Sequence, residues 1–411
     1  MYLIKNLNIP QREAVQHLNG PLLILAGPGS GKTRVITHRI AYLISQGVPA
    51  NRILALTFTN KAAEEMKSRV ETLVYSKCGS WISTFHSFCA RILRNECSLL
   101  GYNPDFSIYD SDDQKRALKQ VLDRLNIETG SNLSRMLGKI RNYKNQGITP
   151  EKVPITKNYW LQKAITVYEH YQEFLLQNNA FDFDDLILKT IEILHNYKSP
   201  RQYYQEKFLY ILIDEFQDTN IPQYKIAKYL TNSSQNICAT GDPDQSIYSW
   251  RGANIGNILE FEKDFSNTKT IKLEQNYRST KKILKVACDI IYKNTLRKEK
   301  SLWTKNKDGE AINIVQAFDN FQEASWICNQ ILKFKKKGYS LNDIVIFYRV
   351  NAQSRSIETA MRNKDIPYVI VGGLEFYRRA EIKDIMAYLL VLNNDRDDIS
   401  LFRILNTRSE E

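Results

Sequence analysis

Short apolar runs bounded by turn residues alternate along the chain with stretches of helical spacing. The first run, Leu22–Ala26, follows the turn Asn19-Gly20-Pro21 and precedes a helical pattern. Further strand-like runs lie at Ile53–Thr57, Trp81–Thr84, Leu209–Ile213, Ile237–Thr240 and Thr270–Leu273. Strands that alternate with helices form parallel sheets with helices on both faces. The pattern therefore predicts an α/β fold.

Helical spacing alone fills the region between residues 108 and 184. One predicted helix begins at a capping-box pair, Ser111 and Gln114, and continues through Leu118, Val121, Leu122 and Leu125. Another follows from Leu161, Ile165, Tyr168 and Leu175. We predict that residues 108–184 form a helical subdomain inserted into a first α/β domain of residues 1–107 and 185–275.

A second β/α series begins after residue 275. Its strand-like runs are Ile312–Val315, Ile344–Tyr348 and Tyr368–Val371, and helical patterns at Ala324–Lys335 and Ser354–Arg362 separate them. Three strands are few for a stable parallel sheet. We predict a second, incomplete α/β domain over residues 276–373, followed by a short segment of another subdomain over residues 374–411.

Composition narrows the protein class. A chain of 411 residues exceeds a single core and suggests roughly two to four domains. No apolar run approaches the roughly 20 residues of a membrane span, and the N-terminus lacks a secretory signal. The six cysteines show no Cys-x-x-Cys spacing, which argues against a zinc or iron–sulfur site. We expect a cytoplasmic protein without a membrane partner.

The net charge of +12 and the pI near 9.2 favour a polyanionic partner. This signal is weak alone, because lysine-rich sequences are often basic through composition bias. It becomes useful only beside aromatic residues in loops.

A glycine-rich loop joins the first predicted strand to a helix. Gly29 and Gly31 let the backbone curl so that its N–H groups point at a phosphate. Lys32 supplies a positive charge for the β- and γ-phosphates, and Thr33 offers a hydroxyl to Mg²⁺. The helix N-terminus adds a partial positive charge. Ala26 replaces the usual first glycine, but the order of strand, loop and helix predicts a nucleoside triphosphate site.

Two adjacent carboxylates follow the apolar strand within Phe208–Thr219. They stand at the C-terminal end of a strand, where α/β sheets bind ligands. Asp214 can hold Mg²⁺ through water, and Glu215 can polarise the water that attacks a γ-phosphate. The alternative is an ordinary strand end with a solvated acidic turn.

Two further loops combine polar and aromatic residues. In Leu56–Met66, Phe58 either stacks on a nucleic-acid base or belongs to the core. In Gly241–Ala253, Gln245 is suited to a γ-phosphate, and Tyr248 and Trp250 alternate with Ser249 and Arg251. Aromatic and basic residues interleaved in this way hold single-stranded nucleic acid.

A Tyr-Arg pair, Tyr277-Arg278, lies where the first β/α series gives way to the second. At a domain junction such a pair can stack an adenine and contact a γ-phosphate, so that hydrolysis is sensed across the junction. The alternative is a surface turn.

These segments, in this order, resemble the superfamily 1 DNA helicases of the UvrD/Rep/PcrA type over essentially the whole chain. The run Gly-Asp-x-Asp-Gln-Ser-Ile-Tyr-x-Trp-Arg-Gly-Ala is close to diagnostic. The matching segments are Leu7-Asn8 with Gln11, Ala26–Arg34, Thr57–Met66, Ile82–Phe88, Asp182–Leu186, Ile213–Thr219, Gly241–Ala253, Leu273–Thr280, Tyr348–Arg355 and Gly372–Phe376.

The resemblance implies RecA-like motor domains that use ATP and Mg²⁺. Gln11 would read the adenine edge, and Arg34 and Tyr277 would sandwich its ring. Thr33 and Asp214 would bind Mg²⁺. The catalytic set would be Glu215 as base with Lys32, Gln245 and Arg278 at the γ-phosphate. The phosphate loop would comprise Ala26, Gly27, Pro28, Gly29, Ser30, Gly31, Lys32, Thr33 and Arg34.

The resemblance also implies DNA as partner, both single-stranded and as a 3′-tailed duplex. The first motor domain would line the single-strand path with Phe58, Asn60, His86, Tyr248, Trp250 and Arg251. The second would contribute Arg349 and Asn351. Family members step 3′ to 5′ along DNA, and we expect one acting in repair or replication, in the bacterial cytosol and associated with the nucleoid.

One departure concerns the C-terminal half. Family members continue with a Thr-x-His-x-x-Lys-Gly-Leu-Glu-like segment and a further arginine at the γ-phosphate, and nothing similar occurs here. We expect a split or truncated reading frame or a fragment, with a complementary C-terminal helicase polypeptide as partner if split. The chain alone would then hydrolyse ATP slowly without unwinding duplex DNA. Besides an active helicase, the alternatives are an ATP- and DNA-binding fragment and the motor half of a helicase–nuclease.

Overall fold

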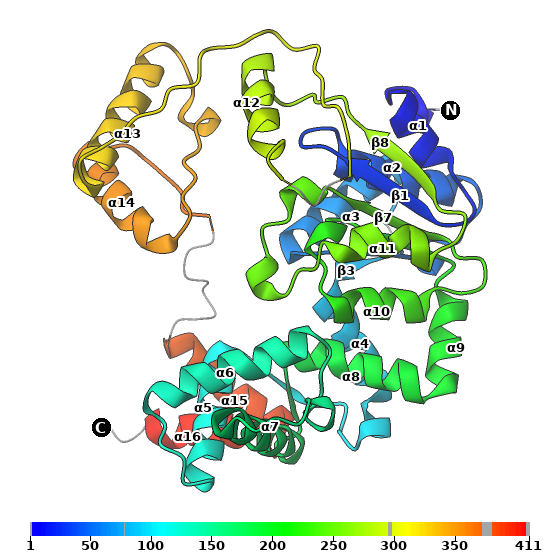
Figure 1. Ribbon diagram of the computed structural model, residues 1–411, viewed down its shortest axis with the longest axis vertical. Helices are drawn as coiled ribbons and strands as arrows, with labels where there is room; N and C mark the ends of the chain where they lie inside the picture. Colours follow the sequence, from blue (N-terminus) through cyan, green and yellow to red (C-terminus); the bar gives the residue numbers. More distant parts are fainter. Residues whose placement is uncertain (1, 78, 295–297, 372–379, 408–411) are drawn as a thin grey trace. The chain divides into compact units, whose positions relative to one another are not determined.

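A computed structural model describes residues 2–77, 79–294, 298–371 and 380–407 (Figure 1). The chain divides into two compact units, one of Met1–Gly309 with Asp384–Glu411 and one of Glu310–Lys383. Within the described ranges, no helix combines the length and the apolar character that crossing a bilayer requires.

The first unit is built on a six-stranded sheet in which every pairing is parallel. Its strand order is β3-β2-β6-β7-β1-β8. Each strand coincides within one residue with an apolar run predicted from sequence, so the α/β prediction is confirmed. The strands are β1 (Leu22–Ala26), β2 (Ile53–Thr57), β3 (Trp81–Thr84), β6 (Tyr210–Ile213), β7 (Ile237–Gly241) and β8 (Lys269–Leu273).

Both faces of this sheet are buried. In β1, Leu23 and Leu25 join one hydrophobic core, and Leu22 and Ile24 join another. The first core is completed by α4 (Phe85–Glu96), α8 (Phe183–Asn196), α9 (Lys198–Lys207), α10 (Ile221–Leu230) and α11 (Gly256–Asp264). The second is completed by α1 (Ile9–Gln16), α2 (Lys32–Ser45) and α3 (Asn60–Val74). Burial on both faces explains why the strands read as continuous apolar runs rather than as alternating ones.

The inserted segment forms a helical subdomain with a core of its own. Its helices are α5 (Ser111–Arg124), α6 (Gly130–Asn145) and α7 (Tyr159–Gln177). A short parallel pair, β4 (Ser107–Tyr109) and β5 (Ala180–Asp182), brings together the two ends of the insertion. The capping box predicted at Ser111 and Gln114 is displaced by one residue, because the Asp110 carboxylate accepts the Asp113 N–H and Asp113 caps in return.

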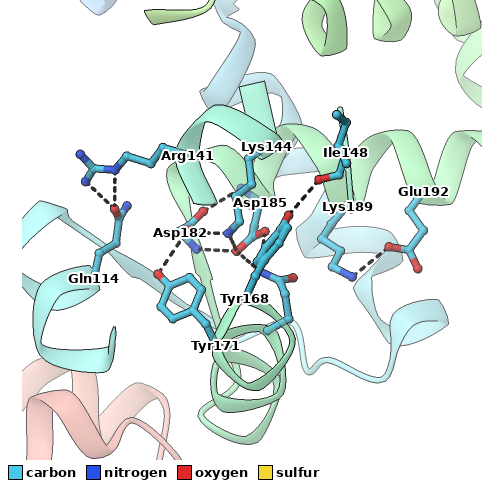
Figure 2. Close-up of polar contacts among 11 residues, drawn as sticks. Gln114, Arg141, Lys144, Ile148, Tyr168, Tyr171, Asp182, Asp185, Lys189 and Glu192 are labelled. Atoms are coloured by element: carbon cyan, nitrogen blue, oxygen red, sulfur yellow. Dashed lines mark hydrogen bonds and ion pairs between the residues drawn. The ribbon is translucent and has the colours of Figure 1, made fainter. Parts of the chain in front are cut away.

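A buried ionic cluster ties the insertion to α8 of the first core. Figure 2 shows Lys144 of α6 between the carboxylates of Asp182 and Asp185, with its Nζ 2.7 Å from an oxygen of each. The Tyr171 hydroxyl donates to Asp182 at 3.1 Å. Asp182 also caps α8, so one lysine joins the end of α6 to the start of α8. Buried carboxylates of this kind require such a partner, because desolvated charge is otherwise costly.

The segment of residues 384–407 belongs to the same compact unit as the insertion. It contains the end of α15 (Ala380–Asn393) and all of α16 (Asp398–Thr407). The Asp397 carboxylate accepts hydrogen bonds from Ser107 and Tyr109, and Ile399 joins the core of the insertion. The boundary that the sequence predicts between residues 373 and 374 lies outside the described residues, as does the motif Gly372–Phe376.

The remaining α-helices of the described ranges are α12 (Lys281–Ile291) in the first unit and α13 (Asn320–Lys336) and α14 (Ser354–Asn363) in the second. The helices predicted at Ala324–Lys335 and Ser354–Arg362 are therefore confirmed.

The three strands predicted in the second unit are wrong. Among the described residues, Ile312–Val315, Ile344–Tyr348 and Tyr368–Val371 take part in no β-ladder. The strand-like run Ile344–Tyr348 still has a physical basis, because Ile344 and Ile346 pack on the core of α13 and α14. Val345, between these two positions, is 67% exposed, and Phe347, after them, is 89% exposed. An extended segment can thus cover helices on one side without a hydrogen-bonded neighbour.

Candidate functional site

The phosphate loop joins β1 to α2 and takes its shape from glycines. Gly29 and Gly31 have φ angles of +63° and +88°, and Gly31 is the N-cap of α2. A side chain is disfavoured in this left-handed region. A Cβ on Gly29 would also lie 2.7 Å from the Cβ of Arg278. The loop therefore passes close to the Tyr-Arg segment predicted to act at the γ-phosphate.

Asn276 fastens that segment to the loop. Its Nδ2 donates to the Pro28 carbonyl at 2.6 Å, and its Oδ1 accepts the Arg278 N–H at 2.9 Å. The neighbouring Tyr277 N–H donates to the Gly29 carbonyl at 2.9 Å. Asn276 is 2% exposed. In the sequence, the only signal for a role of Asn276 is its position beside the Tyr-Arg pair.

Lys32 and the acidic pair meet across the sheet edge. The Lys32 Nζ lies 2.7 Å from Glu215 Oε2. Asp214 is only 5% exposed, which rules out the solvated-turn alternative for this carboxylate. Burial, followed by the nearby Glu215 charge, raises the pKa of Asp214 to about 7, although Lys32 acts in the opposite direction. A buried carboxylate beside a phosphate loop suits a divalent cation, and Thr33 at the start of α2 offers a hydroxyl oxygen.

The three residues predicted at the adenine lie around the segment that precedes and begins α1. Gln11 is 1% exposed and donates from Nε2 to the Ser30 carbonyl at 2.8 Å. Arg34 donates to the Asn6 carbonyl at 3.0 Å. The Tyr277 hydroxyl accepts from Asn8 Nδ2 at 2.8 Å. The side chains of Arg34 and Tyr277 are thus held by the same short N-terminal segment, next to the phosphate loop.

A chain of hydrogen bonds connects Gln245 to the acidic pair. Gln245 Nε2 donates to Asp242 Oδ2 at 2.5 Å, and the Asp242 N–H donates to Gln217 Oε1 at 2.9 Å. Gln217 in turn donates from Nε2 to Glu215 Oε2 at 2.9 Å. Since Glu215 pairs with Lys32, one network joins the phosphate-loop lysine to the glutamine that follows β7. Sequence reasoning assigned no role to Gln217.

Three aromatic side chains form a row on the surface of the first unit. Phe58 and Tyr248 stack with ring centroids 4.9 Å apart, and Tyr248 lies 6.4 Å from Trp250. Trp250 is 65% exposed, and Phe58 is half-buried against Tyr248 rather than enclosed in a core. Asn60, the first residue of α3, is exposed and follows Phe58 by two residues. The Arg251 side chain lies outside the described residues.

The other predicted DNA residues belong to other elements of the fold. His86, in the first turn of α4, makes an edge contact with Phe183 with centroids 5.9 Å apart. Burial lowers the pKa of His86, which favours the neutral imidazole. Arg349 and Asn351 belong to the second unit, where the Arg349 N–H donates to Gln353 Oε1 at 3.0 Å.

Comparison with known proteins points to one family. Residues 7–266 match the UvrD/REP helicase N-terminal domain, and residues 271–411 match the UvrD-like helicase C-terminal domain. A Staphylococcus epidermidis protein named ATP-dependent DNA helicase PcrA is 50% identical over 408 residues, which cover 98% of this chain and 56% of that protein. A Staphylococcus aureus protein of the same name is 48% identical with the same coverage. The chain thus spans about half the length of the curated relatives it matches.

Proposed function

Because this chain belongs to the UvrD/REP helicase family, we propose that it is a motor that couples ATP hydrolysis to 3′–5′ movement along DNA, as a helicase in repair or replication. The observation that carries the proposal is the network from Lys32 through Glu215, Gln217 and Asp242 to Gln245. It joins a phosphate loop to a residue suited to sense a γ-phosphate. DNA as substrate would place the protein at the nucleoid in the bacterial cytosol.

In this proposal the phosphates of ATP lie in the loop before α2. The loop N–H groups, the Lys32 ammonium and the N-terminus of α2 compensate their negative charge. Mg²⁺, held by Thr33 and Asp214, would neutralise charge on the transferring phosphoryl group. Gln11, Arg34 and Tyr277 would hold the adenine.

The chemistry requires a base and cations around the γ-phosphate. Glu215 accepts two hydrogen bonds at Oε2, from Lys32 and Gln217, and we assign its Oε1 as the atom that takes the proton of the attacking water. Arg278, which lies against Gly29, and Gln245 would contact the γ-phosphate from two sides. Because charge builds up on the phosphoryl oxygens in the transition state, these donors act mainly there.

The aromatic row would hold single-stranded DNA. Phe58, Tyr248 and Trp250 offer ring faces on which bases can stack without sequence preference. Tyr248 follows Gln245 by three residues, so a change of the γ-phosphate would reach the DNA contact through a short loop. Asn60, His86 and Arg251 would extend this path on the first unit, and Arg349 and Asn351 on the second.

The test measures ATP hydrolysis by the full chain with and without single-stranded DNA, beside unwinding of duplexes with a 3′ or a 5′ tail. We expect hydrolysis to rise with single-stranded DNA, and any unwinding to require the 3′ tail. Glu215→Gln is the control for contaminating ATPases. ATP turnover that DNA does not stimulate would refute the proposed motor function. DNA-stimulated turnover without unwinding would instead indicate a translocase that does not separate strands.

A further inference from the structure

A lysine far away in sequence is buried against the loop that contains Gln245. Lys300 forms an ion pair with Asp242 and lies 2.9 Å from Asp244 Oδ2. The three side chains are 3%, 0% and 4% exposed. Buried carboxylates need a compensating charge, and Lys300 is the cation paired with both of these within the described residues.

The segment around Lys300 is fixed to the nucleotide site at several points. The Trp303 N–H donates to the Glu274 carbonyl at 3.1 Å, and the Trp303 carbonyl accepts the Asn276 N–H at 2.8 Å. The Leu302 side chain occupies the space into which a Cβ on Gly27 would project. Lys300 therefore approaches Asp242 from a segment that also borders the phosphate loop and the residue that fastens Arg278.

The two carboxylate oxygens of Asp242 accept hydrogen bonds from different side chains, Lys300 and Gln245. Oδ1 accepts from Lys300 and from the Asp244 N–H, and Oδ2 accepts from Gln245 Nε2. An ammonium on Oδ1 fixes the rotation of the carboxylate, and the carboxylate then fixes the amide plane of Gln245. One amide N–H of Gln245 is used in this way, which leaves the other N–H and Oε1 for a phosphate oxygen or the attacking water.

We propose that Lys300 is a positioning residue for γ-phosphate recognition, which acts through Asp242 to hold the amide of Gln245 towards the nucleotide. This inference rests on the proposed function, because it assigns Gln245 to the γ-phosphate. It predicts an effect on the discrimination between ATP and ADP, whereas a lysine that only stabilised the fold would affect both nucleotides equally.

The test compares the affinities of a non-hydrolysable ATP analogue and of ADP, each with Mg²⁺, by calorimetry on the full chain. The variants are Lys300→Ala, Gln245→Ala and the double substitution. We expect Gln245→Ala to lower the preference for the analogue at least fivefold, and Lys300→Ala to lower it to within twofold of that value. The double variant should lose no more than Gln245→Ala alone, because residues that act through one another are not additive. The affinity for ADP should stay within twofold throughout.

Lys298→Ala is the matched control. Lys298, two residues away, pairs with Glu262 rather than with the Asp242 loop, and its removal should leave the preference unchanged. If Lys300→Ala does not fold, the substitution is made in an Asp244→Asn background and compared with Asp244→Asn alone. In that background only one buried carboxylate lacks a compensating charge, instead of two. The same loss of preference is expected between that pair.

An unchanged preference in Lys300→Ala, an equal loss for both nucleotides, or multiplicative losses in the double variant would overturn the inference. A parent that binds neither nucleotide would instead refute the proposed function.

Discussion

Lys32 and Glu215 are 183 residues apart in the chain, and their side chains form an ion pair with Nζ 2.7 Å from Oε2. Glu215 adopts a left-handed conformation, with φ at +49°, which is strained for a residue with a side chain. In this conformation the carboxylate of Glu215 reaches the lysine of the phosphate loop. A triphosphate in the loop and Glu215 would therefore compete for the same ammonium.

This competition predicts opposite effects for the two partners. Lys32→Ala removes a charge-assisted contact to phosphate and should weaken ATP binding by about 10- to 150-fold, from roughly 1.5–3 kcal/mol. Glu215→Gln removes a negative charge near the γ-phosphate and releases Lys32, so ATP affinity should be unchanged or higher while hydrolysis falls by about 10²–10⁴. Calorimetry and steady-state hydrolysis measure the two quantities. Equal weakening of ATP binding by both substitutions would contradict the assignment of Glu215 as base.

The exposed row of aromatic residues predicts a second result. Trp250→Ala should weaken the binding of single-stranded DNA by about 5- to 150-fold, because stacking on an aromatic ring contributes roughly 1–3 kcal/mol per base. The effect should depend little on sequence. Fluorescence anisotropy with a labelled oligonucleotide measures it over a range of salt concentrations.

Stability separates this role from a packing role. Trp250 is 65% exposed, so the unfolding temperature should change little. Tyr159→Ala is the matched control, since Tyr159 is a 70% exposed aromatic residue on the helical insertion. If Tyr159→Ala weakens single-strand binding as much as Trp250→Ala, the aromatic row is not the specific contact.

The sheet could be predicted from the sequence because each of its strands is an apolar run buried on both faces. Leu22–Ala26 needs no knowledge of its neighbours to be recognised, whereas Ile344–Tyr348 does. In the latter, alternate residues pack on α13 and α14, and a strand would further require a hydrogen-bonded partner. Periodicity reports which side chains are buried, and it does not report whether the backbone is paired.

The residues of the candidate site also divide into those that the local sequence identifies and those that only distant contacts identify. An apolar strand precedes the loop that contains Lys32, and another comes directly before Asp214 and Glu215. The local sequence was therefore sufficient to select these three residues. Asn276 and Lys300 form hydrogen bonds with residues 248 and 58 positions away. No local spacing encodes such contacts, and Lys300 lies in a lysine-rich stretch in which it has no distinguishing neighbour.

The close approach of Gly252 and Asn145 gives a third prediction. Gly252 follows the aromatic loop with φ at +84°, and a Cβ on it would lie 2.8 Å from the Cβ of Asn145 in α6. Gly252→Ala therefore combines an unfavourable conformation, which costs about 1–2 kcal/mol, with a steric clash. We expect the loop to shift and single-stranded DNA to bind severalfold more weakly, with ATP affinity unchanged.

Gly47→Ala is the matched control for this substitution. Gly47 has φ at +90° and no atom within 4 Å of its Cβ position, so alanine there incurs the conformational cost without the clash. Its unfolding temperature should fall while DNA binding stays at the parental value. Asn145→Gly should recover part of the DNA affinity in the Gly252→Ala background, and a failure to do so would show that the clash is not the cause.

The acidic cluster at the start of α8 predicts that the stability of the protein depends on pH. Burial, and then the neighbouring Asp182 charge, raise the pKa of Asp184 to about 7, although Lys144 and Arg141 act in the opposite direction. In the unfolded chain the same carboxyl titrates near 3.8. Between these two values the folded protein retains a proton that the unfolded chain has released. Stability therefore falls as the pH rises towards 7, by at most about 1.4 kcal/mol per pH unit, and levels off above it.

Asp184→Asn removes this titration while it preserves the shape of the side chain. The variant should be more stable than the parent at both pH 5 and pH 8, and its advantage should be larger at pH 8, because the folded parent keeps the Asp184 proton up to about pH 7 while the unfolded parent has released it above 3.8. The slope should decrease without disappearing, because burial also raises the pKa of Asp185 to about 6. Urea unfolding at pH 5, 6, 7 and 8 measures the difference, with Asp123→Asn on the exposed side of α5 as the matched change of charge. A stability difference between Asp184→Asn and the parent that stays constant from pH 5 to pH 8 would show that Asp184 is ionised throughout this range.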